Sequence, residues 1–173
     1  MNELKFKSFN EPISSYTEIR AGGVTLGRRN ILNRSILLVD DEPQTLDLLR
    51  LMLKRDGYDV YEAGGGEDAL EMVKNLLPDL VLLDVMMPDI DGIQVCEGIR
   101  TDHRTADIPV VMLSARTHQT AVEKGILVGA TRYLSKPISR ADLLRHVREV
   151  LDGIPSIEMQ SIRQNLVARG ITG

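Results

Sequence analysis

The sequence predicts an α/β fold in which a doubly wound, five-stranded parallel sheet is covered by helices on both faces. Three continuous apolar runs predict strands, namely Ile36–Val39, Leu80–Leu83 and Val110–Leu113. Apolar runs without alternation are typical of strands that are buried on both faces, as in a parallel sheet. Segments with apolar residues at helical spacing separate these runs, so strand and helix alternate along the chain.

Four apolar stripes predict helices between and after the strands. The first stripe follows Pro43, which suits a first helical turn, and the last follows Ser139, which suits an N-cap. The stripes consist of Leu46, Leu49 and Leu53; of Leu70, Val73 and Leu77; of Ile93, Cys96 and Ile99; and of Leu143, Val147, Val150 and Leu151.

Two further candidate strands, Tyr58–Tyr61 and Thr131–Lys136, mix polar and apolar residues. Because edge strands of a doubly wound sheet are less covered than central ones, we place these two segments at the edges. With right-handed crossovers, the strand order is then 2-1-3-4-5, which is a flavodoxin-like order.

Charge divides the 173 residues into three parts. The net charge is +3 over residues 1–34, −8 over residues 35–152 and +1 over residues 153–173. We expect a basic, flexible N-terminal extension, one folded domain over 35–152, and a C-terminal extension. Twenty-one residues are too few for a DNA-binding or enzymatic output domain, so we expect the folded domain to stand alone. The C-terminal extension can form a short helix, with an apolar stripe of Met159, Ile162 and Leu166 that is closed by Gly170.

Composition excludes several classes of protein. The net charge of −4 gives no support to direct nucleic-acid binding, and the apolar runs are too short for membrane insertion. The first residues lack the apolar stretch of a signal peptide. A single cysteine, Cys96, excludes an internal disulfide and a multi-thiolate metal site and suits a reducing cytoplasm.

Polar side chains gather where the predicted strands end. Asp40 and Asp41 follow the first run, Asp84 and Ser114 follow the third and fourth strands, and Lys136 ends the fifth. The carboxyl ends of the strands in an open parallel sheet face one crevice, so these groups are expected to meet there. A cluster of oxygen ligands without histidine or cysteine favours Mg²⁺, and a lysine ammonium suits an anionic group such as phosphoryl.

Asp84 is the best candidate for a nucleophile, because it ends the central strand and is flanked by the other groups. A carboxylate can attack phosphorus and form an aspartyl phosphate. Asp40 and Asp41 are better interpreted as metal ligands, either directly or through water.

Four motifs resemble the receiver domain of two-component response regulators. They are ILLVDDEP (36–43), LVLLDVMMPDIDG (80–92), VVMLSA (110–115) and YLSKPI (133–138), in the expected order and at the expected separations. The resemblance covers residues 35–152. It implies that Asp84 accepts a phosphoryl group from a phosphohistidine on a sensor histidine kinase or a histidine phosphotransfer protein.

The resemblance also assigns roles to the surrounding residues. It implies that Mg²⁺ is held by Asp41, Asp84 and the backbone carbonyl of Met86, with Asp40 acting largely through a bound water. It implies that the phosphoryl group is contacted by Ser114, by the backbone N–H of Ala115 and by Lys136.

A second set of implied features concerns backbone shape and switching. The Lys136–Pro137 peptide is expected to be cis, and Pro88 and Gly92 are expected to shape the loop after the phosphorylated strand. Tyr133 matches the switch aromatic of the family, whose ring turns inward when Ser114 moves toward the phosphoryl group.

The implied function is phosphorylation-dependent binding of a downstream protein through the surface around Tyr133. No enzymatic activity is expected beyond self-phosphorylation and autodephosphorylation on Asp84. A homodimer is possible. However, Thr131 and Arg132 replace the acidic pair that forms salt bridges in the activated dimer of one DNA-binding subfamily, so that particular dimer is in doubt.

Two alternatives stay open at this point. One is a Mg²⁺-dependent phosphatase or phosphotransferase of the haloacid-dehalogenase type, although that family places a second acid where this chain has Met86. The other is a pseudo-receiver that binds partners without phosphate, against which the complete set of acidic, hydroxyl and lysine residues argues.

Overall fold

Strands and helices alternate in the computed structural model, which describes residues 34–88, 90–115 and 119–171. The strands are β1 (Ser35–Val39), β2 (Asp59–Ala63), β3 (Leu80–Asp84), β4 (Val110–Ser114) and β5 (Arg132–Ser135). The helices are α1 (Pro43–Lys54), α2 (Gly66–Leu76), α3 (Gly92–Thr101), α4 (Gln119–Leu127), α5 (Arg140–Leu151) and α6 (Ile157–Ala168). The basic N-terminal extension predicted for residues 1–34 lies, except for Arg34, outside the described residues.

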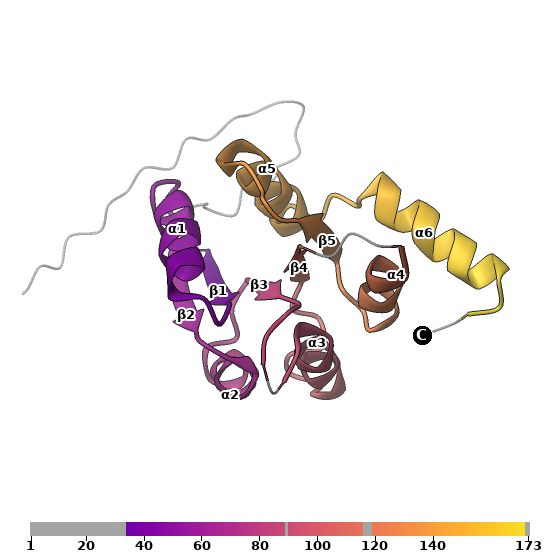
Figure 1. Ribbon diagram of the computed structural model, residues 1–173, viewed down its shortest axis with the longest axis horizontal. Helices are drawn as coiled ribbons and strands as arrows, with labels where there is room; N and C mark the ends of the chain where they lie inside the picture. Colours follow the sequence, from indigo (N-terminus) through magenta and orange to yellow (C-terminus); the bar gives the residue numbers. More distant parts are fainter. Residues whose placement is uncertain (1–33, 89, 116–118, 172–173) are drawn as a thin grey trace, which may run out of the picture.

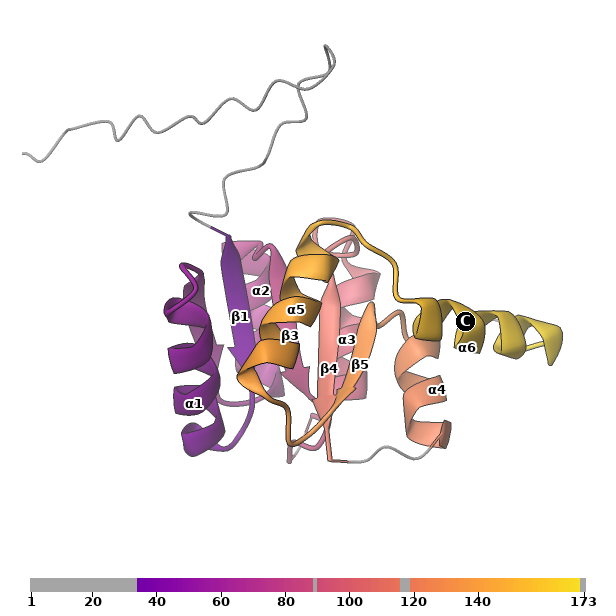
Figure 2. The same ribbon diagram turned by 90° about the horizontal axis from the view of Figure 1, so that it is seen from above.

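The five strands form one parallel sheet in the order β2-β1-β3-β4-β5, as predicted (Figure 1), and Figure 2 shows β1, β3, β4 and β5 side by side. The strand order reverses direction between β1 and β3, because the chain first builds outward to β2 and then crosses back. Because all five strands are parallel, their carboxyl ends lie at one edge of the sheet. Ligands bind at this edge in folds of this kind, at the point where the strand order reverses.

Each central strand contributes side chains to both faces of the sheet. In β1, Ile36 and Leu38 pack on the face covered by α1 and α5, whereas Leu37 and Val39 pack on the face covered by α2 and α3 (Figure 1). Because both faces are covered, neither set of alternating positions is polar, and the sequence shows a continuous apolar run.

The edge strands differ from the predicted segments by one or two residues. β2 begins at Asp59, and its burial alternates, whereas every residue of β3 is buried. Tyr58, which was expected to begin the strand, is buried just before it. β5 is shorter than the predicted segment and covers only Arg132–Ser135.

Local signals at the helix starts agree with the sequence. Pro43 occupies the first turn of α1, and the Ser139 hydroxyl accepts a hydrogen bond of 3.1 Å from the backbone N–H of Asp142 at the start of α5. Asp91 and Gln94 cap α3 reciprocally, so that this helix begins at a fixed place just after the loop that follows β3. No apolar stripe identified α4 in the sequence, because its buried side includes Gly125 beside Ile126.

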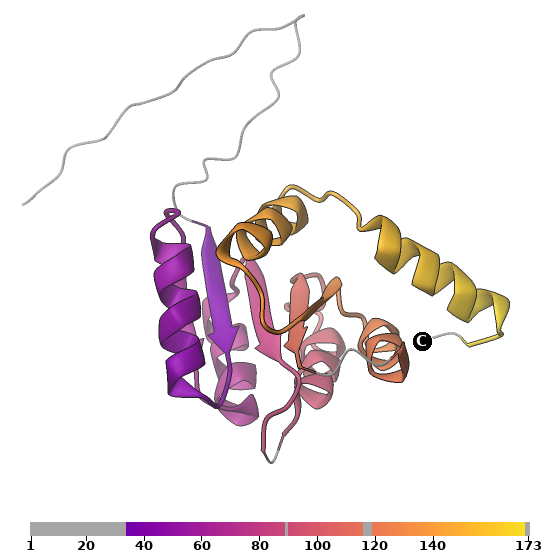
Figure 3. The same cartoon turned by 45° about the horizontal axis from the view of Figure 1, so that its top comes forward.

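Among the residues that the structure describes, no helix has the length and apolar character needed to cross a membrane. The last helix, α6, lies beyond the β5 edge of the sheet beside α4, and its outer side faces away from the rest of the molecule (Figure 3).

Candidate functional site

Two carboxylates lie side by side at the carboxyl edge of the sheet. The register of β1 and β3 pairs Val39 with Leu83, so the next residues, Asp40 and Asp84, are neighbours across the two strands. Both side chains are buried, since Asp40 is 2% exposed and Asp84 is 5% exposed. Two buried carboxylates at such short range repel each other, and the pair therefore calls for a cation.

The ammonium of Lys136 supplies that cation in this structure. Its Nζ donates to Asp84 Oδ1 at 2.5 Å and to Asp40 Oδ2 at 2.7 Å. Lys136 follows β5, which is separated from β3 by β4, so its long side chain reaches past the end of β4 to both acids. Burial lowers the pKa of Lys136, but the hydrogen bonds and charges of Asp40 and Asp84 outweigh this effect and raise the pKa above 10.5.

Backbone N–H groups hold the other oxygen of each carboxylate. The N–H of Met86 donates to Asp84 Oδ2 at 2.6 Å, and the N–H of Glu42 donates to Asp40 Oδ1 at 2.9 Å. Each carboxylate therefore has one oxygen fixed by the chain that follows it and one oxygen turned toward Lys136. This arrangement sets the orientation of the Asp84 carboxylate.

We expect Lys136→Met to destabilise the fold by about 2 kcal/mol at pH 7, because the substitution leaves two buried carboxylates without their cation. Breaking a buried pair costs about 3–5 kcal/mol, and the smaller value reflects the 24% exposure of the Lys136 side chain. Since the pKa of Lys136 is raised, this stabilisation is complete below pH 10.5 and is lost as the pH rises through the raised value.

Urea unfolding of wild type and variant between pH 7 and pH 12 measures this difference. Lys124→Met removes the same charge from an exposed position on α4 and serves as the control. If Lys136→Met and Lys124→Met lower the free energy of unfolding equally, Lys136 does not offset the repulsion between the Asp40 and Asp84 carboxylates.

Ser114 and Ala115 lie at the end of the neighbouring strand. Ser114 is fully buried as the last residue of β4, and Ala115 is exposed directly after it. The backbone N–H of Lys136 donates to the Ser114 carbonyl at 2.8 Å, which ties the lysine to the end of β4. The Lys136–Pro137 peptide is cis, as the resemblance implies.

The remaining predicted metal ligands lie at the rim. Asp41 is exposed, and Met86 is 46% exposed in the loop after β3. Within residues 34–88, 90–115 and 119–171, no three acidic, histidine or cysteine side chains are gathered as a ready-made metal site. The converging part of the predicted ligand set is thus the pair Asp40 and Asp84, both of which are oxygen donors suited to a hard divalent ion.

Gly92 holds the loop after β3 against the end of that strand. A Cβ atom at Gly92 would lie 2.2 Å from the carbonyl oxygen of Asp84, and the Gly92 N–H donates to the Val85 carbonyl at 3.1 Å. Only glycine allows this approach, so Gly92 shapes the loop that carries Met86, as expected.

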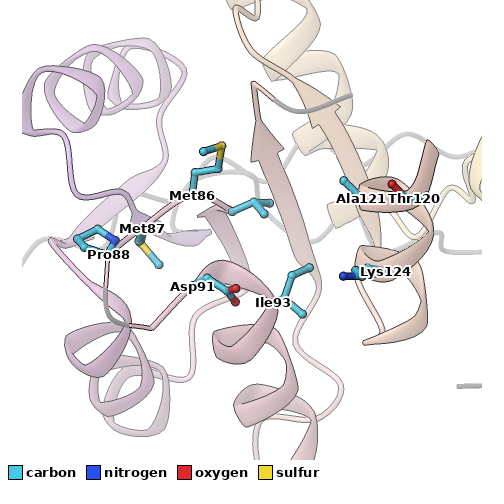
Figure 4. Close-up of a pocket in the computed structure, with 9 residues that line it drawn as sticks. Met86, Met87, Pro88, Asp91, Ile93, Thr120, Ala121 and Lys124 are labelled. Atoms are coloured by element: carbon cyan, nitrogen blue, oxygen red, sulfur yellow. The ribbon is translucent and has the colours of Figure 1, made fainter. Parts of the chain in front are cut away.

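A groove of about 790 Å³ opens beside this loop (Figure 4). Its lining comes from the loop after β3, the start of α3 and the side of α4, and consists of Val85, Met86, Met87, Pro88, Asp91, Ile93, Thr120, Ala121 and Lys124. The groove thus adjoins Asp84 through the two residues that follow it in the chain.

Tyr133 lies between the sheet core and the C-terminal helix. It belongs to β5, pairs in register with Met112 of β4, and its ring lies close over Gly125 of α4. It packs against both the core on the α2–α3 side and a small apolar cluster that includes α6.

Arg132 has a structural role that the sequence did not indicate. Its side chain is buried, forms an ion pair with Glu149 of α5 at 2.6 Å, and donates to the Ile154 carbonyl at 2.9 Å. Arg132 Nη1 also lies 2.8 Å from His146 Nδ1. Burial lowers the pKa of His146, and the charges of Arg145 and Arg132 lower it further. Arg132 therefore joins β5 to α5 and to the segment that leads into α6.

The chain is similar to known signalling proteins over most of its length. The family model of the response regulator receiver domain matches residues 36–148. The chain is 41% identical over 129 residues to the DNA-binding dual master transcriptional regulator RpaA of Synechocystis, which covers 73% of this chain and 54% of the relative. It is 38% identical over 134 residues to the alkaline phosphatase synthesis transcriptional regulatory protein PhoP of Bacillus subtilis, covering 75% of this chain and 55% of PhoP. The match thus spans about half the length of these relatives.

Solved structures show the same likeness. The chemotaxis protein CheY4 of Vibrio cholerae has a TM-score of 0.65 and 29% identity, and the match covers 67% of this chain and 97% of that one. A CheY-like response regulator receiver domain protein from Methanospirillum hungatei has a TM-score of 0.66 and 27% identity, covering 70% and 95%. With its parallel sheet, its strand order and its acidic site, the chain belongs to the response regulator receiver domain family of two-component signalling.

Proposed function

We propose that Asp84 is the phosphoacceptor of this receiver domain and that its phosphorylation controls binding to a downstream protein. The observation that carries the proposal is the fixed Asp84 carboxylate, buried at the end of β3 with Met86 N–H on one oxygen and Lys136 on the other. The phosphoryl donor is a phosphohistidine on a sensor histidine kinase or a histidine phosphotransfer protein, in keeping with the family.

The proposed reaction is a transfer between two side chains. An oxygen of Asp84 attacks phosphorus as the P–N bond of the phosphohistidine breaks, and the bond electrons leave with the imidazole of the donor. The product is an acyl phosphate on Asp84. Lys136 neutralises charge on the transferred group, and the Ser114 hydroxyl and the Ala115 N–H donate hydrogen bonds to its oxygens.

The residues at the site fit a divalent cation, and we assign it as Mg²⁺. Asp40 and Asp84 are oxygen donors that converge on one positive charge, and Asp41 and the Met86 carbonyl lie beside them in the chain. Asp41, Asp84 and the Met86 carbonyl would hold the ion, and Asp40 would act through a bound water. Bound Mg²⁺ supplies positive charge that offsets the charge of the transferring phosphoryl group.

Tyr133 and Ser114 form the proposed route from the site to the surface. Ser114 adjoins Lys136 through a backbone hydrogen bond, and Tyr133 lies three residues before Lys136 on β5. A shift of Ser114 toward the phosphoryl group would change the space available to the Tyr133 ring. The target is a protein of unknown identity, and a homodimer is compatible with this route.

Membership of the receiver family argues against the haloacid-dehalogenase alternative, as does Met86 at the position of the second acid. The pseudo-receiver alternative predicts no phosphoryl uptake at all. One experiment distinguishes the proposed function from both alternatives.

The experiment is incubation of the full chain with acetyl phosphate, either with Mg²⁺ or with a chelator, followed by intact-mass measurement. We expect one phosphoryl group per chain with Mg²⁺ and none with the chelator, and reduction of the acyl phosphate with borohydride should map it to Asp84. Absence of uptake would favour the pseudo-receiver, and rapid hydrolysis of unrelated phosphate monoesters would favour the hydrolase.

A further inference from the structure

We infer that α6 is a releasable cover over a helix-binding surface on α4 and β5, and that this surface fits a partner helix with the chemistry of α6 itself. We call it the α4–β5 surface, and it is formed by Val122, Ile126 and Leu127 of α4 and by Tyr133 of β5. The inference deepens the proposed function, on which its link to signalling rests, because it assigns an occupant to the surface that contains Tyr133.

Apolar contact between α6 and the α4–β5 surface comes from one stripe of the helix. Met159 and Leu166 of α6 are buried there together with Ile126, and Ile162 is partly buried between them. The spacing is the i, i+3, i+7 pattern of an amphipathic helix that lies along another element. The α4–β5 surface therefore already binds a helix within this chain.

Two arginines add polar contacts beside this stripe, Arg163 within α6 and Arg169 as the C-cap residue that follows the helix. Arg163 donates to the Ala130 carbonyl at 3.0 Å, in the turn between α4 and β5. Arg169 pairs with the carboxylate of Glu123 of α4 at 2.9 Å. These contacts fix the direction of α6 and set a charge requirement for any helix that takes its place.

We expect the rest of the fold to stay intact when α6 is released. Neither of the two main cores, which cover the two faces of the sheet, contains a residue of α6. The helix lies beyond the last strand, with Ile157 85% exposed and Val167 64% exposed, and only one side of it contacts the domain (Figures 1 and 3). An element with so few buried contacts can open locally while the sheet stays folded.

Release of α6 would uncover an apolar strip with defined polar ends. The strip offers Val122, Ile126 and Tyr133 to apolar side chains, and the Glu123 carboxylate and the Ala130 carbonyl to donors. A partner helix with apolar residues at i, i+3 and i+7 and arginines near its middle and its end matches this pattern. Tyr133 of β5 is the end of the proposed signalling route, so a helix bound to this strip would contact that route directly.

The test uses the full chain without any phosphodonor, so its outcome is separate from that of the Asp84 proposal. Leu166→Glu places a charge in the apolar contact, whereas Val167→Glu places the same charge at the adjacent exposed position. Amide hydrogen exchange reports on the docking of α6, and a fluorescent synthetic peptide of residues 156–171 reports on the α4–β5 surface.

We expect Leu166→Glu to speed exchange in α6 by about tenfold or more, with the sheet amides still protected, and Val167→Glu to leave exchange unchanged. We expect the peptide to bind the Leu166→Glu chain about tenfold more tightly than wild type, since a docked α6 occupies the surface in wild type. A peptide that carries the Leu166→Glu change itself should not bind.

Equal peptide binding by wild type and Leu166→Glu, or no binding to a folded Leu166→Glu chain, would overturn the inference. So would exchange of α6 only together with the whole sheet, because α6 would then be part of the cooperative fold. If the sheet amides of the Leu166→Glu chain are no longer protected from exchange, Leu166→Ala is measured in its place. We expect the same faster exchange in α6 and the same tighter peptide binding, and the same results would overturn the inference.

Discussion

Asp84→Asn should take up no phosphoryl group from acetyl phosphate under conditions in which the wild-type chain becomes phosphorylated. The amide is nearly the same size as the carboxylate, and its oxygen can still accept from Met86 N–H or from Lys136. It lacks the anionic oxygen that attacks phosphorus, so the expected effect is complete loss and not a reduced rate. Intact-mass measurement after incubation with Mg²⁺ gives the result directly.

Asp79→Asn is the matched control for this prediction. Asp79 lies just before the opposite end of the same strand, β3, where its carboxylate accepts a hydrogen bond of 2.8 Å from the Ser35 N–H. This variant should be phosphorylated like wild type. Full uptake by Asp84→Asn would show that another group is the acceptor, and Asp40 and Asp41 would be the next candidates.

Gly92→Ala should destabilise the fold by about 3 kcal/mol, although alanine is intrinsically the better helix former. The new Cβ would lie 2.2 Å from the Asp84 carbonyl oxygen and 2.8 Å from Val85 Cα, and both of these atoms belong to the backbone. Overpacking usually costs about 1–3 kcal/mol, and a backbone neighbour cannot turn aside as a side chain can. This cost exceeds the gain of about 1 kcal/mol in helix propensity at the first position of α3.

Urea unfolding of Gly92→Ala beside Gly64→Ala tests this expectation. A Cβ at Gly64 meets nothing within 4 Å, so the control should unfold close to wild type. Gly92→Ala should also take up less phosphoryl, because a displaced Val85 moves the Met86 N–H that fixes Asp84. A Gly92→Ala chain as stable as the control would mean that the loop relaxes without cost.

Much of the fold could be predicted because the local patterns and the long-range packing agree. The apolar run of β1 has no polar positions, since α1 and α5 cover one face and α2 and α3 cover the other. The convergence of Asp40 and Asp84 follows from parallel strands that end at one edge. By contrast, α4 could be expected only from the alternation of elements, because among the large apolar residues of this short helix only Val122 and Ile126 lie at helical spacing.

Other features depend on side-chain reach, which spacing does not encode. A charged residue in a strand suggests exposure, yet Arg132 is buried, and its two terminal guanidinium nitrogens are paired with Glu149 and the Ile154 carbonyl. In the same way, the stripe of Met159 and Leu166 predicts an amphipathic helix but not the surface against which it packs. The position of α6 on α4 is a property of the whole fold.

The bridge made by Lys136 joins strands that are far apart in the sequence. Lys136 lies 96 residues from Asp40 and 52 residues from Asp84 along the chain, and the three meet only when β1, β3 and β5 have joined the sheet. Contacts this distant form late in folding, because closing long loops is entropically costly. A chain in which one of these three strands has not joined the sheet therefore lacks the assembled site, so phosphoryl uptake at the proposed acceptor Asp84 would report that β1, β3 and β5 are in place.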